Sequence, residues 1–198
     1  MKKKSGLVSL IFYPVEVLGP GKRLGIWLQG CSRRCPNCVS PHSWEFDEAL
    51  RVPLVDIEQK LKFYSLFTEK LTISGGEPFE QPDFLRNLLI SARNNGYKDI
   101  FVYSGQLYGD LSNRFPDIID LIDVIIDGPY IQERKTRLIW RGSDNQILNI
   151  CSKNPQLAEF YRDFLVKEED DTEMQIVQVG KKAFVVGIPR DGKTLGQL

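Results

Sequence analysis

The chain has 198 residues, of which 42% are hydrophobic and 11% aromatic, and its 26 basic and 26 acidic residues give a net charge of zero. This length and composition indicate a globular protein with one main core, and the balanced charge argues against a nucleic-acid-binding surface. No apolar run approaches the roughly 20 residues that a membrane span requires, so we expect a soluble, cytoplasmic protein.

The first part of the chain contains two short apolar runs. Residues 7–13 follow a basic start, but Pro14 and Glu16 interrupt the run too early for a signal peptide, so it predicts a strand. A second strand is expected at 24–29, after a loop rich in glycine and proline. Residues 40–53 predict irregular structure, because proline occurs near both ends.

The middle of the chain alternates helical and strand patterns. The predicted elements are helices at 55–67 and 82–95, strands at 71–73, 100–103 and 124–126, and short helical segments at 107–111 and 116–121. This alternation predicts a parallel sheet with right-handed crossovers. In such sheets, functional residues collect on the loops that follow the strands.

The pattern changes after residue 150. Residues 155–166 predict an amphipathic helix, 167–172 an acidic turn, and 174–179 with 182–188 a β-hairpin around Gly180. We therefore expect a small C-terminal extension, made of a helix and a hairpin, that either covers a sheet edge or forms a small appendage.

Three of the four cysteines lie within eight positions, at Cys31, Cys35 and Cys38, whereas Cys151 is far away. Such a cluster predicts a metal site more than disulfides. Three thiolates are an incomplete ligand set both for structural zinc and for a cubane cluster, since each takes four. Cys151 is expected to be a buried small hydrophobe, and His42, the only histidine, a loop side chain near enough to complete a zinc site.

A second candidate site follows the predicted strand at 71–73, in the run Gly75-Gly76-Glu77-Pro78. Alone, this run is typical of a tight turn. Two glycines also allow a ligand to approach the backbone closely, and this interpretation gains weight because the run follows the cysteine loop in a βα alternation. Ser104-Gly105 and Asp127-Gly128 stand at the corresponding places after the next two strands.

CSRRCPNC followed by a strand ending in GGEP resembles the radical S-adenosylmethionine (SAM) superfamily. GPGKRLGIWLQG before the cysteines, and DGPY and WRGSDNQ further on, resemble the activating proteins of anaerobic (class III) ribonucleotide reductase, a branch of the glycyl-radical-enzyme activases. The resemblance implies an α/β fold: a partial (βα) barrel of mostly parallel strands over residues 1–150. Residues 151–198 would be an extension packed on this domain.

The resemblance also implies roles for the candidate residues. Cys31, Cys35 and Cys38 would be the catalytic and metal-binding set, holding three irons of one [4Fe–4S] cluster whose fourth iron binds SAM. The implied cofactor-binding residues are Gly75, Gly76, Glu77, Pro78, Ser104, Gly105, Asp127 and Gly128. Among them, Gly75, Gly76 and Glu77 would meet the methionine amino group, and Ser104 the carboxylate or ribose.

The implied reaction is reductive cleavage of SAM to a 5′-deoxyadenosyl radical, which installs a glycyl radical on anaerobic ribonucleotide reductase. An electron donor such as flavodoxin would supply the electron. Relatives often have His-Asn where this chain has Val39-Ser40, and many have an aromatic residue in place of Asn37. Two alternatives stay open: a radical SAM enzyme with another peptide or small-molecule substrate, and a zinc-stabilised binding module using His42 or Cys151 as fourth ligand.

Overall fold

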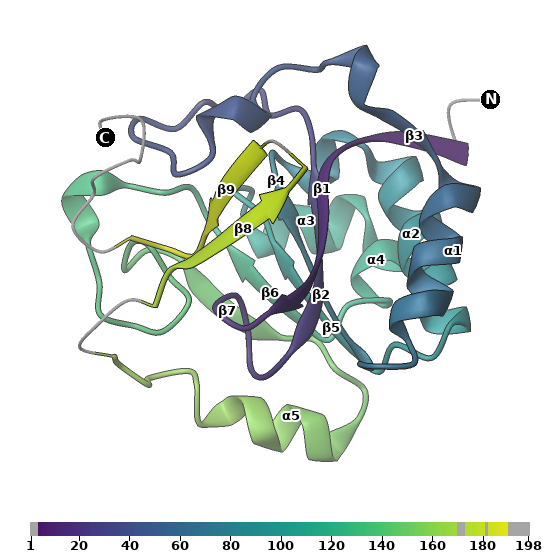
Figure 1. The fold of residues 1–198 in the computed structure, drawn as a ribbon. Helices are drawn as coiled ribbons and strands as arrows, with labels where there is room; N and C mark the ends of the chain where they lie inside the picture. The colour runs from purple at the N-terminus through teal and green to yellow at the C-terminus, as the bar shows by residue number, and fades with distance from the viewer. Residues whose placement is uncertain (1–3, 170–172, 181, 190–198) are drawn as a thin grey trace.

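The main feature of the structure, a computed structural model, is a seven-stranded sheet in the order β3-β1-β2-β4-β5-β6-β7 (Figure 1). The structure describes residues 4–169, 173–180 and 182–189. The sheet strands are β1 (Ser5–Val15), β2 (Arg23–Leu28), β3 (Arg51–Pro53), β4 (Lys70–Gly75), β5 (Asp99–Tyr103), β6 (Val124–Asp127) and β7 (Ile147–Ile150). The remaining elements are α1 (Leu54–Tyr64), α2 (Pro82–Asn94), α3 (Tyr108–Arg114), α4 (Pro116–Ile119), α5 (Pro155–Arg162), β8 (Gln175–Val179) and β9 (Lys182–Val186).

The four central strands, β2, β4, β5 and β6, are parallel to one another. The outer strands β1, β3 and β7 each pair antiparallel to a neighbour. The predicted α/β class and parallel sheet are thus confirmed for the centre of the molecule. The sheet is open in the described part of the chain, with β3 and β7 as its ends.

The alternation of side chains along the strands places a core on each face of the sheet. On β5, Ile100 and Val102 belong to the core shared with α1 to α4, while Phe101 belongs to a cluster with Tyr161 of α5. Trp27 of β2 packs with Val177 and Val186 of the β8–β9 hairpin. Figure 1 shows the corresponding arrangement, with α1 and α2 to the right of the sheet and the hairpin on its other side.

Two predicted helices end three or four residues early in the structure. The helix expected at 55–67 ends at Tyr64, where the chain turns and the Phe67 N–H donates to the Tyr64 carbonyl. The helix expected at 155–166 ends at Arg162. Beyond it, the carbonyls of Phe164 and Leu165 accept hydrogen bonds from Arg141 Nη2, at 2.8 and 3.0 Å.

Two short strands were not predicted from the sequence. β3 lies in the segment expected to be irregular, and β7 follows the last predicted strand of the parallel set. The predicted hairpin is found as β8–β9, with Val177 opposite Phe184. Part of the predicted acidic turn, residues 170–172, lies outside the described residues. Within the described ranges, no helix is long and apolar enough to cross a membrane.

A buried arginine joins the N-terminal ends of the parallel strands. The guanidinium of Arg23, at the start of β2, is fully buried and donates to both oxygens of Asp99 at the start of β5, at 2.8 and 2.9 Å. It also donates to Thr72 Oγ1 at 2.7 Å. Tyr161 Oη donates to Asp99 Oδ1 at 2.8 Å, so this network links α5 to the sheet.

Candidate functional site

The cysteine loop leaves the C-terminal end of β2 and is closed at its base by hydrogen bonds. The buried Gln29 donates through Nε2 to the carbonyls of His42 and Glu45, at 3.1 and 2.8 Å. The N–H of Gly30 donates to Ser43 O at 2.8 Å, and that of Cys31 to Trp44 O at 2.9 Å. The residues between these contacts therefore form a loop whose two ends are held together beside the sheet.

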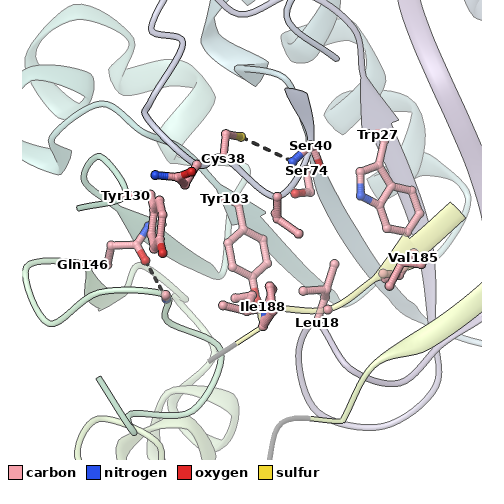
Figure 2. A pocket seen from close by; sticks show the side chains of 16 residues that line it. Leu18, Trp27, Cys38, Ser40, Ser74, Tyr103, Tyr130, Gln146, Val185 and Ile188 are labelled. Carbon is pink, nitrogen blue, oxygen red and sulfur yellow. Dashed lines mark hydrogen bonds between the residues drawn. The ribbon is translucent and has the colours of Figure 1, made fainter. Parts of the chain in front are cut away.

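The three clustered thiols are partly buried, and each faces backbone N–H groups. Burial raises the pKa of Cys31, Cys35 and Cys38, and hydrogen bonds from N–H groups oppose this rise. The donors are Arg33 and Arg34 for Cys31, Tyr130 for Cys35, and Ser40 for Cys38, the last at 3.4 Å (Figure 2). N–H groups directed at sulfur stabilise thiolates and are a common means of tuning iron–sulfur centres.

The four cysteines are all free thiols. Among the described residues, no three His, Cys, Asp or Glu side chains are arranged around one position suited to a single metal ion. His42 lies with its ring edge-on to Phe184, their centroids 6.1 Å apart, and burial lowers its pKa. Cys151 packs against the core next to the helices.

The two glycines of the GGEP run allow the end of β4 to pack against the cysteine loop. Gly75 has φ +109°, and a Cβ there would lie 2.2 Å from Leu28 O. A Cβ on Gly76 would lie 2.3 Å from Gly30 O. The N–H groups of Gly76 and Glu77 donate to the carbonyls of Leu28 and Gly30, at 2.8 and 2.9 Å. Close backbone contact with the cysteine loop therefore requires glycine at both positions.

Glu77 connects the ends of β4 and β5. Its side chain is buried, and Oε1 accepts from Phe79 N and Ser104 Oγ at 3.1 and 2.9 Å, while Oε2 accepts from Gly105 N at 2.8 Å. Burial raises the pKa of Glu77, whereas these hydrogen bonds and the charge of Arg33 lower it. Glu77, Ser104 and Gly105 are thus brought together, as expected, but mainly by contacts with one another. Pro78 is buried at the start of a short 3₁₀ turn.

Asp127 and Gly128 fix the turn after β6. Asp127 is buried, and its carboxylate accepts from the N–H of Tyr108 at 2.6 Å and from Asn149 Nδ2 at 3.0 Å. Gly128 has φ +96° and donates its N–H to Gln106 O at 3.0 Å. The predicted pair therefore holds the start of α3 and the strand β7 at the same edge of the sheet as the cysteine loop.

A cavity of ≈ 150 Å³ lies beside the cysteine loop (Figure 2). Of the predicted site residues, only Cys38 lines it. Sequence reasoning missed Ser74 and Tyr103, which stand one residue before the predicted Gly75 and Ser104 and do line the cavity. The signal that would have found them is the strand period of two, which directs these last strand side chains to the face opposite the helices.

Tyr103 brings an unpaired polar atom to this cavity. Its Oη is buried and has no hydrogen-bond partner among the described residues, and burial raises the pKa of Tyr103. Gln146, another lining residue, donates to Gly128 O at 3.1 Å and accepts from Gly142 N at 2.8 Å. The cavity thus combines aromatic walls, polar atoms and one edge of the cysteine loop.

Comparison with known proteins identifies this arrangement. Residues 17–149 match the family model described as "4Fe-4S single cluster domain". The anaerobic ribonucleoside-triphosphate reductase-activating protein of Escherichia coli is 30% identical over 149 residues, which are 70% of this chain and 95% of the relative. The protein of the same name from Haemophilus influenzae is 34% identical, over 71% of this chain and 96% of the relative.

The chain belongs to the 4Fe-4S single cluster domain family, in the branch of these activating proteins. The radical SAM glycyl-radical-activase resemblance seen in the sequence is thereby confirmed. A further relative, the pyruvate formate-lyase-activating enzyme of Staphylococcus aureus, is 27% identical over 82% of this chain and 69% of its own length.

The residues present fit the family's single cluster. Three thiols with N–H donors on one closed loop are a donor set of the right chemistry for iron, and the glycine contacts hold that loop against the sheet. The cavity next to Cys38, with the unpaired Tyr103 Oη, adds space and a polar group beside the loop.

Proposed function

We propose that this protein is a radical SAM activating enzyme that installs a glycyl radical on anaerobic ribonucleoside-triphosphate reductase. The observation that carries the proposal is the match to activating proteins of that name over 95% of the Escherichia coli relative's length. The three clustered thiols on a closed loop support it, since they supply the protein ligands of a single cluster with one iron left open.

We assign to Cys31, Cys35 and Cys38 the role of holding the cluster. When bound, the cluster and SAM together supply a one-electron cleavage that yields a radical able to remove a hydrogen atom from glycine. The chain's contribution is to orient these groups and to exclude water from them.

The GGEP turn has a structural role in this proposal. Gly75 and Gly76 keep the cysteine loop close to β4, and Pro78 and the buried Glu77 carboxylate fix the turn that would lie beneath the methionine part of SAM. Direct recognition of the amino group by this turn remains part of the proposal.

Two further strand ends complete the proposed site. Ser104 and Gly105, after β5, donate hydrogen bonds to Glu77. Asp127, at the end of β6, accepts from the N–H of Tyr108 and so holds the start of α3. Ser74 and Tyr103 line the cavity, and we assign them contacts to the nucleoside part of SAM.

We further propose a partial barrel over residues 1–150, built on the open seven-stranded sheet, with residues 151–198 as an extension packed on it. The hydrogen bond between Tyr161 and Asp99 supports the packing, because it joins α5 to the start of β5. A cytoplasmic location belongs to the same proposal, since free thiols are typical of a reducing compartment. A reductant of the flavodoxin type is proposed because the one-electron cleavage of SAM needs an electron donor.

The test is to purify and reconstitute the protein without oxygen, to measure iron and sulfide, and then to incubate it with reductant, SAM and the reductase. We expect one cluster per chain, 5′-deoxyadenosine, and a glycyl-radical signal by electron paramagnetic resonance. A colourless protein with zinc alone would contradict the proposal.

Pyruvate formate-lyase is the second candidate partner, because the Staphylococcus aureus relative matches over 82% of this chain. Each partner is therefore assayed in parallel. 5′-Deoxyadenosine formed without a glycyl radical on either partner would favour a radical SAM enzyme with another substrate.

A further inference from the structure

The β8–β9 hairpin stands apart from the main sheet. Its two strands pair with each other and form a separate two-stranded sheet. One side is buried against β1 and β2 through Val177 and Val186, whereas Ile176 is 75% exposed. A two-stranded hairpin is only marginally stable by itself, so this one depends on its contact with the body of the protein.

Few polar contacts attach the hairpin to the sheet. Among the described residues, one side chain of the hairpin, Gln175, makes the hydrogen bonds to β1 and to the residue that follows β1. Gln175 Nε2 donates to Pro14 O at 2.7 Å, and Gln175 Oε1 accepts from Glu16 N at 3.3 Å. The remaining attachment is the apolar contact with Trp27 and its neighbours.

The hairpin and the residues after it form one wall of the cavity beside Cys38. Val185, Val186, Gly187, Ile188 and Pro189 line the cavity on that side (Figure 2). The opposite walls include Ser74 on β4 and Tyr103 on β5, which are central strands with a partner on each side. Hence the hairpin is attached more weakly than these two strand walls.

The cavity is small beside the ligand that the proposed function requires. It measures ≈ 150 Å³, whereas sites for small organic ligands usually measure about 300–1,000 Å³. Under the proposed function, a nucleoside and then a peptide segment that carries a glycine would occupy more space than this. The elements that move in proteins are those of low local stability, and the hairpin has that character.

We propose that the β8–β9 hairpin is a displaceable wall, which moves away from Leu18 and Tyr103 when SAM and then the partner's peptide enter the cavity. This inference rests on the proposed function. It makes the hairpin a determinant of affinity, because the free energy of opening is subtracted from the free energy of binding. The hairpin lies beyond residue 149, where the family match ends.

The test compares Gln175→Ala with Gln178→Ala in the full chain carrying its cluster. Both glutamines lie on β8, but Gln178 donates only to Gly180 within the hairpin, at 3.3 Å, and is exposed. SAM affinity is measured by calorimetry without reductant, so that SAM is not consumed. We expect Gln175→Ala to bind SAM about 3- to 10-fold more tightly, the equivalent of losing one or two net hydrogen bonds that favour the closed state. Gln178→Ala should bind SAM as the unaltered protein does.

Hydrogen exchange of the unaltered protein gives a second, independent measurement. Addition of SAM should speed exchange of the β8 and β9 amides while it slows exchange in the cysteine loop. Unchanged or slower exchange in the hairpin, or equal or weaker SAM binding by Gln175→Ala, would overturn the displaceable wall and leave the proposed function intact. A cluster-loaded protein that fails to bind SAM would overturn both.

Discussion

Cys35 and Cys151 carry the same side chain in opposite settings, which makes them a matched pair for testing the cluster ligands. Cys35 lies on the closed loop with the Tyr130 N–H directed at its sulfur. Cys151 packs against the core, and burial raises the pKa of its thiol to about 11, so it stays protonated at neutral pH. We expect Cys35→Ala to lose most of its iron and sulfide, and Cys151→Ala to retain both, as measured by chemical analysis and visible absorbance.

Two outcomes would contradict this assignment. A Cys35→Ala protein with a full complement of iron would remove Cys35 from the ligand set. Iron loss in Cys151→Ala, with the fold intact by circular dichroism, would make Cys151 a ligand.

Gly76 and Gly109 differ in the space that surrounds them. A Cβ on Gly76 would lie 2.3 Å from Gly30 O, whereas a Cβ on Gly109, within α3, would meet nothing within 4 Å. Gly76→Ala should therefore force the end of β4 away from the cysteine loop and lower the free energy of unfolding by about 2 kcal/mol or more. Gly109→Ala should raise it by about 0.5–1 kcal/mol, because alanine favours a helix. Urea unfolding of the cluster-free proteins measures both, and equal stability of the two variants would contradict the packing role of Gly76.

At the scale of elements, the four parallel central strands were predictable, whereas the outer strands β3 and β7 were not. Each of the four central strands has a run of β-branched or aromatic residues followed by a turn signal. β3 has three residues, including Pro53, and β7 ends the sheet with Ile147 57% exposed. Strands of this kind form because a neighbouring edge offers partners, and a linear sequence does not contain that information.

The candidate site was predictable in its location but not in its contacts. The loops after the parallel strands do meet at one edge, as their sequence order implies. The structure adds that Glu77 is buried and shared between Ser104 and Gly105, which follows from tertiary contacts between loops 27 and 28 residues apart in sequence. Local sequence patterns do not specify such pairs.

The buried Arg23 network tests how α5 and the sheet depend on each other. Burial opposes the charge on Arg23, but the hydrogen bonds and charge of Asp99 prevail and raise its pKa. Asp99→Ala leaves this guanidinium buried without its partner, so we expect a loss of about 3–5 kcal/mol in the free energy of unfolding. Tyr161→Phe removes the hydrogen bond to Asp99 and the longer one from Arg23 Nη1, and it should lose about 1–2 kcal/mol.

The control is Lys98→Ala, next to Asp99 in sequence. Lys98 pairs with Glu69 at 2.7 Å, but both side chains are more than half exposed, so the loss should stay below about 1 kcal/mol. The urea midpoint of unfolding, at an unchanged m-value, gives the change in the free energy of unfolding for each of the three variants. A loss in Asp99→Ala no larger than that in Lys98→Ala would show that Arg23 finds other partners.

At the scale of the whole molecule, the cluster site and the core are separate. The three cysteines lie on a loop outside the sheet, whereas the main core joins the sheet to α1 to α4. The loop base is closed by backbone hydrogen bonds that involve no thiol, such as Gly30 N to Ser43 O. Small metal domains that lack an apolar core unfold without their metal, but this chain has a core of its own.

Removal of the cluster should therefore leave the fold intact. We expect the cluster-free protein to keep its far-ultraviolet circular dichroism and cooperative melting, with a Tm lower by about 5–10 °C, which corresponds to about 2–3 kcal/mol for a chain of this size. New protease cleavage should be confined to the cysteine loop, because only that segment loses contacts. Cys35→Ala, which should not assemble the cluster, is the control. Its Tm should equal that of the chelator-treated protein. Loss of secondary structure on chelation would contradict this expectation. It would mean that the C-terminal ends of β2 and β4 need the cluster in order to stay folded.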